Sequence, residues 1–181
     1  MLDAAGVTYI AAPAHVDERA LEAELEGQPP ATVAQALAVA KAVAVSKTLP
    51  GELVLGSDSL VEAGGRRFHK PANREGAAEH LRFFSGKTMH LHSAAALARH
   101  GEVLWQDGAM ASLQVIEMSE AFIENYLAHE WPAVATCVGV FRIEARGVQL
   151  FEAIEGDQFT VLGMPLLKVL ATLRGLGVLA Q

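Results

Sequence analysis

Two strand-like stretches joined by a short turn constrain the fold of this 181-residue chain more than any other feature. Residues 88–98 and 103–115 have the composition of β-strands, and His100-Gly101 lies between them. So short a connection joins antiparallel neighbours, which predicts a sheet that is at least partly antiparallel. We expect further strands at residues 8–13, 52–56, 138–143 and 148–154, with a hairpin turn at 63–66.

Helix signals alternate with these strands. Residues 32–35 have the pattern of a capping box. Asn73 and Ser119 are typical N-caps, and Pro165 favours the first turn of a last helix. The helices expected from these signals cover residues 32–47, 73–86, 119–131 and 166–174. Interspersed helices and strands predict an α/β (mixed α+β) fold.

Composition limits the functional classes. The chain is 51% hydrophobic and 19% charged, which excludes a disordered protein, and its net charge of −7 argues against a nucleic-acid binder. The apolar-leaning run 27–40 contains Pro29-Pro30 and is too short to span a membrane. No basic residue precedes Arg19, so no signal peptide is visible. The single cysteine, Cys137, fits a reducing cytosol and is expected to be a small buried residue. We therefore expect a cytoplasmic protein without nucleic-acid or membrane partners.

Three charged residues stand in positions where chemistry is possible. Asp58 follows the apolar strand 52–56, where it can bind a metal or deprotonate a water, or can end the strand through its own backbone. Lys41 interrupts an apolar helix, so its ammonium either faces solvent or meets an anion. Pro71 biases Lys70 toward an extended backbone, from which its side chain points across the sheet end or into solvent. The pattern alone leaves these alternatives open.

Other common motifs are weak or absent. His90-x-His92 places two imidazoles on one strand face, but no third ligand lies nearby in the sequence, which disfavours a structural zinc site. The sequence contains no Walker or dinucleotide-type glycine loop and no Gly-x-Ser-x-Gly motif. These observations exclude several common nucleotide-binding and hydrolase folds.

Taken in order, the short motifs of the chain resemble the Maf (septum-formation inhibitor) family of nucleoside triphosphate pyrophosphatases. The motifs that carry the resemblance are Val16-Asp17-Glu18, Ala40-Lys41-Ala42, Leu55-Gly56-Ser57-Asp58-Ser59, Lys70-Pro71, Ser85-Gly86-Lys87 with His90, Ser119-Glu120 before Tyr126, Glu144 with Gly147, Leu150-Phe151-Glu152, Glu155-Gly156 and Leu162-Gly163-Met164-Pro165-Leu166. They span nearly the whole chain, and the ordered set is more specific than any one motif.

The resemblance implies an inosine-triphosphatase-like fold, in which an elongated, curved mixed sheet is flanked by helices. It implies a hydrolase that cleaves nucleoside triphosphates, including modified ones, between the α and β phosphates. The products would be a nucleoside monophosphate and pyrophosphate. A divalent metal, Mg²⁺ or Mn²⁺, would be required. A triphosphate brings roughly four negative charges to an acidic protein, so a metal ion and lysines are needed to neutralise the phosphates.

The resemblance also implies roles for particular residues. Asp58 corresponds to the catalytic carboxylate that acts as general base, and Glu18 and Asp58 are the expected metal ligands. The substrate-binding residues would be two phosphate-binding lysines and two residues associated with substrate choice, namely Lys41, Lys70, Ser59 and Glu144. Glu144 is closer to the 7-methyl-GTP branch than to the dTTP/UTP branch, whereas Ser59 fits neither, so only the general nucleotide class is predicted.

Some positions depart from the family pattern. We expect one domain over residues 1–181 that lacks the family's first strand and its Ser-x-Ser-x-x-Arg phosphate loop. Ile116 stands where the family often has Arg, and Val138-Gly139 replaces Ala-Gly. The first departure motivates an alternative function: a catalytically impaired nucleotide-binding or regulatory protein that acts on cell division. Sheet surface exposed by a missing strand would favour self-association, so a homodimer is a further expectation.

Overall fold

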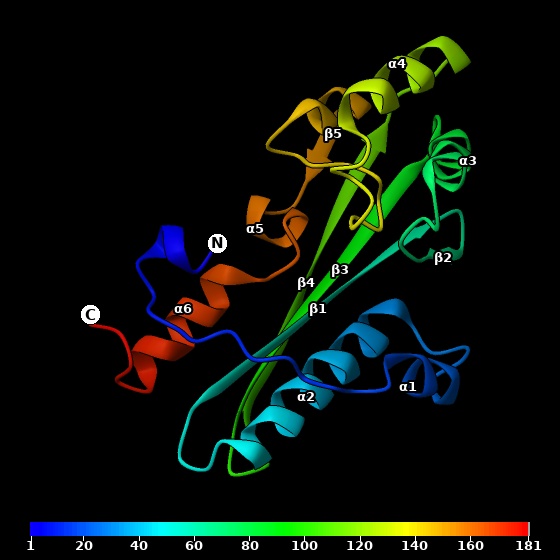
Figure 1. Cartoon of the computed structure of the whole chain (residues 1–181). Helices are drawn as coiled ribbons and strands as arrows, with labels where there is room; N and C mark the ends of the chain where they lie inside the picture. Colours follow the sequence, from blue (N-terminus) through cyan, green and yellow to red (C-terminus); the bar gives the residue numbers. More distant parts are fainter. Residues whose placement is uncertain (181) are drawn as a thin grey trace. The chain divides into compact units, whose positions relative to one another are not determined.

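The computed structural model describes residues 1–180, and its strands form one five-stranded sheet with the order β2-β1-β3-β4-β5 (Figure 1). The chain divides into two compact units. The first unit comprises Met1–Ser59, His92–Met110 and Gln158–Gln181, and the second comprises Leu60–Leu91 and Ala111–Asp157. Three of the strands, β1, β3 and β4, contribute residues to both units. Helices flank the sheet, which confirms the mixed α/β class.

The hairpin predictions are confirmed. The strands are β1 (Val54–Ala63), β2 (Arg66–Phe68), β3 (Thr88–Arg99), β4 (Glu102–Val115) and β5 (Phe151–Glu155). β1 and β2 pair antiparallel across Gly64-Gly65, with Val61 opposite Phe68. β4 and β5 also pair antiparallel, with Ser112 opposite Glu155. Only His100 and Gly101 separate β3 from β4, and both have the positive φ that such tight turns require.

The four predicted helices are present with small changes at their ends. The α-helices are α1 (Glu18–Glu24), α2 (Pro30–Thr48), α3 (Arg74–Phe84), α4 (Glu120–Glu130), α5 (Gln158–Val161) and α6 (Leu166–Gly175), with 3-10 turns η1 (Asp3–Ala5) and η2 (Arg146–Leu150). Asn73 and Ser119 cap α3 and α4 through their side chains, as predicted. The prediction of a capping box at the start of α2 was wrong. The helix begins at Pro30 without a side-chain cap, and proline is tolerated there because the first backbone N–H of a helix has no partner within the helix.

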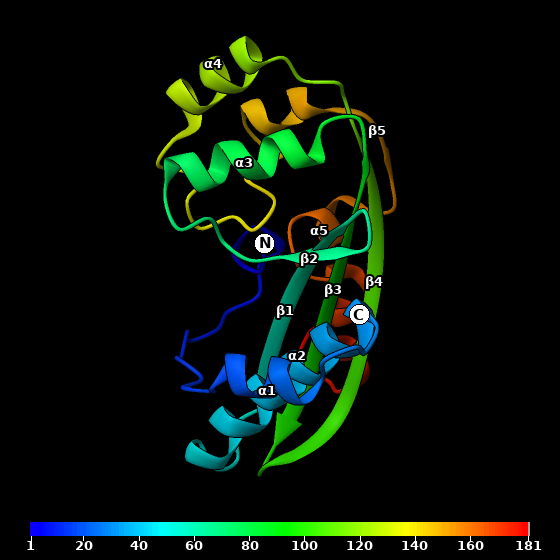
Figure 2. The ribbon, with the colours of Figure 1, turned by 90° about the vertical axis from the view of Figure 1, so that its right-hand side faces the viewer.

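In the first unit, helices cover both faces of the strands (Figures 1 and 2). One face carries a buried cluster in which α6, through Val169 and Leu173, packs against Ala95 and Leu97 of β3. Leu55 of β1 packs at the edge of this cluster. Gly56, the next residue, faces the backbone of α2 instead. Because neighbouring residues of a strand point to opposite faces, α2 and α6 lie on opposite sides of β1.

The second unit has its own core. Phe68 of β2 makes edge and tilted ring contacts with Phe83 and Phe84 of α3. Ion pairs join α3 to α4, since the Arg82 guanidinium donates to Glu120 at 3.0 Å and that of Arg74 donates to Glu124 at 2.8 Å. These pairs are exposed and add little stability, so the buried aromatic packing contributes more to the unit than they do.

Several predicted strands were wrong. Residues 8–13 are extended but pair with no other strand of the described chain, and a strand needs a neighbour to satisfy its backbone. Residues 138–143 form turns and irregular backbone, and of the predicted strand 148–154 only the part from Phe151 is a strand, after η2. Within residues 1–180, none of the helices has both the length and the apolar character needed to span a bilayer.

Candidate active site

Asp58 lies in the middle of a strand. The sequence predicted that the strand ends at Gly56 and that Asp58 follows it, but β1 continues to Ala63. This correction also removes the alternative in which Asp58 ends the strand through a turn of its own backbone. The carboxylate is therefore held by a regular strand, on the same face as Gly56 and toward α2.

Gly56 lets α2 approach the strand unusually closely. A Cβ at this position would lie 2.6 Å from the Ala42 backbone nitrogen and would overlap the Ala38 carbonyl oxygen. Only glycine allows this backbone-to-backbone contact, which is a common reason for glycine inside a strand. Ala38 and Ala42 are fully buried here. Lys41 lies next to Ala42 on the helix, so this packing brings Lys41 to the strand at the level of Asp58.

Lys41 joins two carboxylates. Its Nζ donates a hydrogen bond to Asp58 Oδ1 at 2.6 Å and lies 3.0 Å from Glu18 Oε1. The Asp58 side chain is 11% exposed, that of Lys41 20% and that of Glu18 51%. Of the two alternatives for Lys41, the structure therefore selects the one in which the ammonium meets anions. We call Glu18, Lys41 and Asp58 the acidic cluster.

The position of Glu18 depends on a helix cap. Asp17 Oδ1 accepts a hydrogen bond from the backbone N–H of Ala20, which starts α1. Glu18 is thus the first residue of the helix, where the helix dipole favours a negative charge.

The charges of the cluster do not cancel. Burial has the largest effect on the pKa of Asp58, and it raises this pKa. The Lys41 ammonium lowers it, whereas the charges of Glu18 and Glu22 raise it further, so the pKa lies above its ordinary value of 3.8. Burial lowers the pKa of Lys41, but its hydrogen bonds and attraction to Asp58 and Glu18 outweigh burial and raise it. Both pKa values are therefore raised: that of Asp58 because burial and the neighbouring carboxylates outweigh the Lys41 ammonium, and that of Lys41 because its anionic partners outweigh burial. Two carboxylates around one ammonium leave a net negative site that suits a cation.

The serines that flank Asp58 point to the other face of β1. Ser57 Oγ lies 2.9 Å from the Ala94 carbonyl oxygen and 3.2 Å from that of Gly163. Ser93 Oγ donates to the Thr160 carbonyl, so Ser59 donates its hydroxyl proton to Ser93 Oγ, 3.0 Å away. Ser59 therefore ties β1 to β3 within the first unit, and its role in substrate choice stays a prediction.

Lys70 and Glu144 belong to the second unit, and both are exposed. Burial raises the pKa of the Cys137 thiol, Glu144 raises it further and Lys70 lowers it. Both charges therefore act on one thiol, which places Lys70 and Glu144 in one region of that unit. Cys137 itself is half-buried, not fully buried as predicted.

The described residues contain no group of three or more His, Cys, Asp or Glu side chains arranged to hold a metal ion. Two carboxylate oxygens, from Glu18 and Asp58, converge on the Lys41 ammonium. Mg²⁺ is commonly bound by one or two carboxylates together with substrate phosphates and water. The acidic cluster fits such a shared site, and it does not fit a metal site made by the protein alone.

Comparison with known proteins identifies the family. The sequence model described as "Maf-like protein" matches residues 1–176. The chain belongs to the Maf family. It is 49% identical over 179 residues to the 7-methyl-GTP pyrophosphatase of Mesorhizobium japonicum and 47% identical to that of Rhizobium etli, in each case over 98% of this chain and 90% of the relative. It is 44% identical to the nucleoside triphosphate pyrophosphatase of Sphingopyxis alaskensis, over 100% of this chain and 93% of the relative.

The match confirms the family that the short motifs indicated, and it extends over nearly the whole chain. Gly56, Ser57 and Asp58 lie in one of those motifs, but the packing role of Gly56 was not predicted from it. A glycine inside a strand pattern is the signal that could have found it.

Proposed function

We propose that this protein is a nucleoside triphosphate pyrophosphatase that cleaves the bond between the α and β phosphates. The observation that carries the proposal is the acidic cluster: a largely buried Asp58 with a raised pKa, held 2.6 Å from the Lys41 ammonium and joined through it to Glu18. Membership of the Maf family and the names of the relatives support the same activity.

In this proposal Asp58 is the general base. Burial raises its pKa, which makes its carboxylate a better proton acceptor than that of an exposed aspartate. It removes a proton from a water molecule, and the resulting hydroxide attacks the α phosphorus, so that the bond to the bridging oxygen breaks and pyrophosphate leaves. Lys41 fixes the orientation of the carboxylate through its hydrogen bond and supplies positive charge toward the phosphates. Catalysis then consists of positioning and of neutralising phosphate charge, as is general for phosphoryl transfer.

Glu18 and Asp58 would hold the divalent metal together with phosphate oxygens of the substrate. When bound, Mg²⁺ or Mn²⁺ supplies neutralisation of the phosphates and polarisation of the phosphoryl oxygens. Glu18 suits this role because its side chain is half exposed and can turn toward an arriving ion. Lys41 keeps the two carboxylates together before the ion arrives.

The finer parts of the proposal concern the substrate. Lys70 would bind phosphate, and Ser59 and Glu144 would contribute to substrate choice. Relatives named for 7-methyl-GTP support 7-methyl-GTP as a substrate.

We also propose that the protein acts in the cytoplasm and forms a homodimer. The segment 8–13 supports self-association, because its apolar side chains are exposed and Ile10 is 94% exposed. Light scattering of the purified protein should give twice the mass of one chain, whereas a mass near 19 kDa would contradict the dimer.

Phosphorus NMR of the reaction products tests the activity. GTP, 7-methyl-GTP, UTP and dTTP are each incubated with the protein and Mg²⁺ or Mn²⁺. The proposal predicts equal amounts of nucleoside monophosphate and pyrophosphate from at least one of them. A nucleoside diphosphate with orthophosphate would refute cleavage between the α and β phosphates, and binding without hydrolysis would favour the impaired, regulatory alternative.

A further inference from the structure

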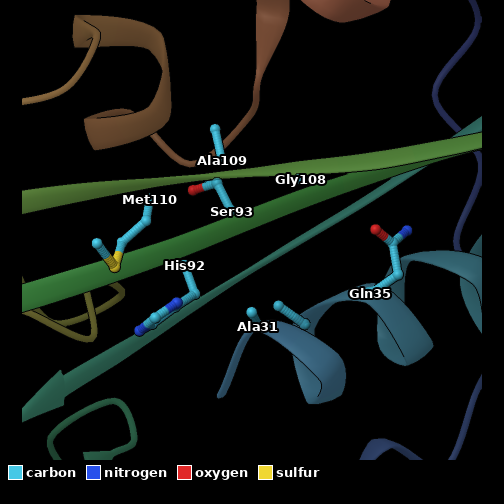
Figure 3. A pocket seen from close by; sticks show the side chains of 8 residues that line it. Ala31, Gln35, His92, Ser93, Gly108, Ala109 and Met110 are labelled. Atoms are coloured by element: carbon cyan, nitrogen blue, oxygen red, sulfur yellow. The ribbon is translucent and has the colours of Figure 1, made fainter. Parts of the chain in front are cut away.

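A pocket of about 360 Å³ lies in the first unit, between the start of α2 and the strands β3 and β4 (Figure 3). Its size lies within the usual range for small-molecule sites, roughly 300–1,000 Å³. The residues that line it are Ala31, Ala34, Gln35, His92, Ser93, Gly108, Ala109 and Met110. None of them has a role in the proposed reaction described above.

The walls of the pocket suit a flat ring. Ala31, Ala34 and Gly108 contribute almost no side-chain volume, so backbone and methyl groups form much of the lining. Gly108 cannot be enlarged freely, since a Cβ there would lie 3.2 Å from the Ser93 carbonyl oxygen. The side chains of His92 and Met110 extend to the same side of the strands in Figure 3. A thioether such as that of Met110, which is 52% exposed, packs favourably against aromatic rings.

Gln35 gives the pocket a hydrogen-bond acceptor. Its Nε2 donates to the Ala95 carbonyl oxygen at 3.4 Å, which fixes the orientation of the amide because a carbonyl can only accept. Its Oε1 lies 3.8 Å from the position of a Cβ on Gly108, at the pocket wall. Within residues 1–180, no side chain or backbone group donates a hydrogen bond to this oxygen. An acceptor without a protein partner at a pocket wall indicates a ligand that carries an N–H donor.

The pocket and the acidic cluster are reached from one helix. Gln35 and Lys41 are both on α2, and at 1.5 Å per residue their backbones are roughly 9 Å apart along the axis. This separation is comparable to that between the base and the phosphates of one nucleotide. Because Gln35 and Lys41 also project about 120° apart around the helix, this spacing gives only the minimum length that a nucleotide must span with its base in the pocket and its triphosphate at Asp58.

We propose that this pocket binds the base of the substrate, that the base is a guanine-type purine, and that Gln35 Oε1 accepts a hydrogen bond from it. Guanine fits because its pairing edge presents adjacent N–H donors and because a two-ring base fills a pocket of this size better than a pyrimidine. The inference rests on the proposed function for the placement of the triphosphate, and it makes Gln35 a specificity-determining residue.

The first test measures hydrolysis by Gln35→Leu, which keeps the size of the side chain and removes the acceptor. The proposal predicts that kcat/KM for GTP and 7-methyl-GTP falls about tenfold, because the purine loses a hydrogen bond to the half-buried amide. The value for UTP should be unchanged, because in this proposal its single ring is too small to fill the pocket and bring its N3–H to Gln35. Equal losses for all nucleotides, or no loss for any, would overturn the role of Gln35.

The second test does not depend on hydrolysis. Binding of guanosine and 7-methylguanosine, which carry no phosphate, is measured by calorimetry without metal. Ala31→Phe fills the pocket from an exposed helix position, and Thr32→Phe adds the same ring at a neighbouring exposed position that does not line it. The proposal predicts that the nucleosides bind to the natural chain and to Thr32→Phe, and at least tenfold more weakly to Ala31→Phe.

Together, the two tests distinguish a failure of the proposed activity from a failure of the pocket assignment. If no triphosphate is hydrolysed but the nucleosides bind and Ala31→Phe blocks them, the proposed function fails and the pocket assignment stands. If triphosphates are hydrolysed but the nucleosides do not bind, or Ala31→Phe binds them as well as Thr32→Phe does, the pocket assignment fails and the activity stands.

Discussion

Replacing Gly56 with alanine should damage the acidic cluster without touching any of its side chains. The added Cβ would lie 2.6 Å from the Ala42 nitrogen, whereas ordinary contacts of this kind begin at 3.4 Å. Helix α2 must therefore move away from β1 by roughly 0.8 Å, and Lys41 moves with it. A displacement near 1 Å at a catalytic site can cost about 10²-fold in rate, so we expect Gly56→Ala to lower kcat by one to two orders of magnitude.

The same overlap should lower stability. Forcing extra atoms into a packed interior costs typically about 1–3 kcal/mol, which for a chain of this size lowers Tm by roughly 2–12 °C. Release of pyrophosphate reports the rate, and circular dichroism during heating reports Tm. Gly76→Ala is the matched control, because a Cβ there would lie 3.6 Å from its nearest neighbour and the residue is in a helix. Full activity and an unchanged Tm for Gly56→Ala would refute the idea that close packing of α2 positions Lys41.

Two further predictions concern the acidic cluster. Glu18→Gln removes one of the proposed metal ligands, so the Mg²⁺ concentration for half-maximal rate should rise about tenfold. Because the side chain is half exposed, Tm should change little. An unchanged dependence of the rate on Mg²⁺ would show that Glu18 is not a metal ligand. The rate should fall as the pH is lowered through the raised pKa of Asp58, because the base is active only when ionised, and this decline should be centred above pH 3.8. A rate that stays constant down to pH 4 would contradict the assignment of Asp58 as the base.

Local signals predicted much of the fold. Asn73 and Ser119 cap their helices through side chains, as their positions suggested, because an N-cap depends on only three or four neighbouring residues. The turn at His100-Gly101 was equally local. That the chain forms a single domain stays a prediction.

The errors arose where structure depends on distant partners. Residues 8–13 have strand composition but lack a neighbouring strand, and pairing cannot be read from one segment alone. β1 was predicted to end before Ser57, because Ser and Asp often stop strands. In the structure Ser57 instead bonds to carbonyls of Ala94 and Gly163, so its polar side chain is satisfied inside the sheet.

The candidate site shows the same contrast between features predicted from the sequence and features that depend on distant contacts. The resemblance indicated Glu18, Lys41 and Asp58 separately, and the structure brings both carboxylates within hydrogen-bond distance of the Lys41 ammonium. Gly56 and Gln35 were not predicted as functional positions. The importance of Gly56 depends on the approach of a helix, and that of Gln35 depends on a pocket shared by three elements.

Pyrophosphate release by Asp58→Asn tests the central claim most directly. The variant keeps the size of the side chain and removes its ability to take a proton, while Asp107→Asn makes the same chemical change at the ion pair with Lys168, away from the acidic cluster. We expect no measurable turnover by Asp58→Asn, a Tm close to that of the natural chain, and normal turnover by Asp107→Asn. Turnover by Asp58→Asn equal to that of the natural chain would show that Asp58 is not the base.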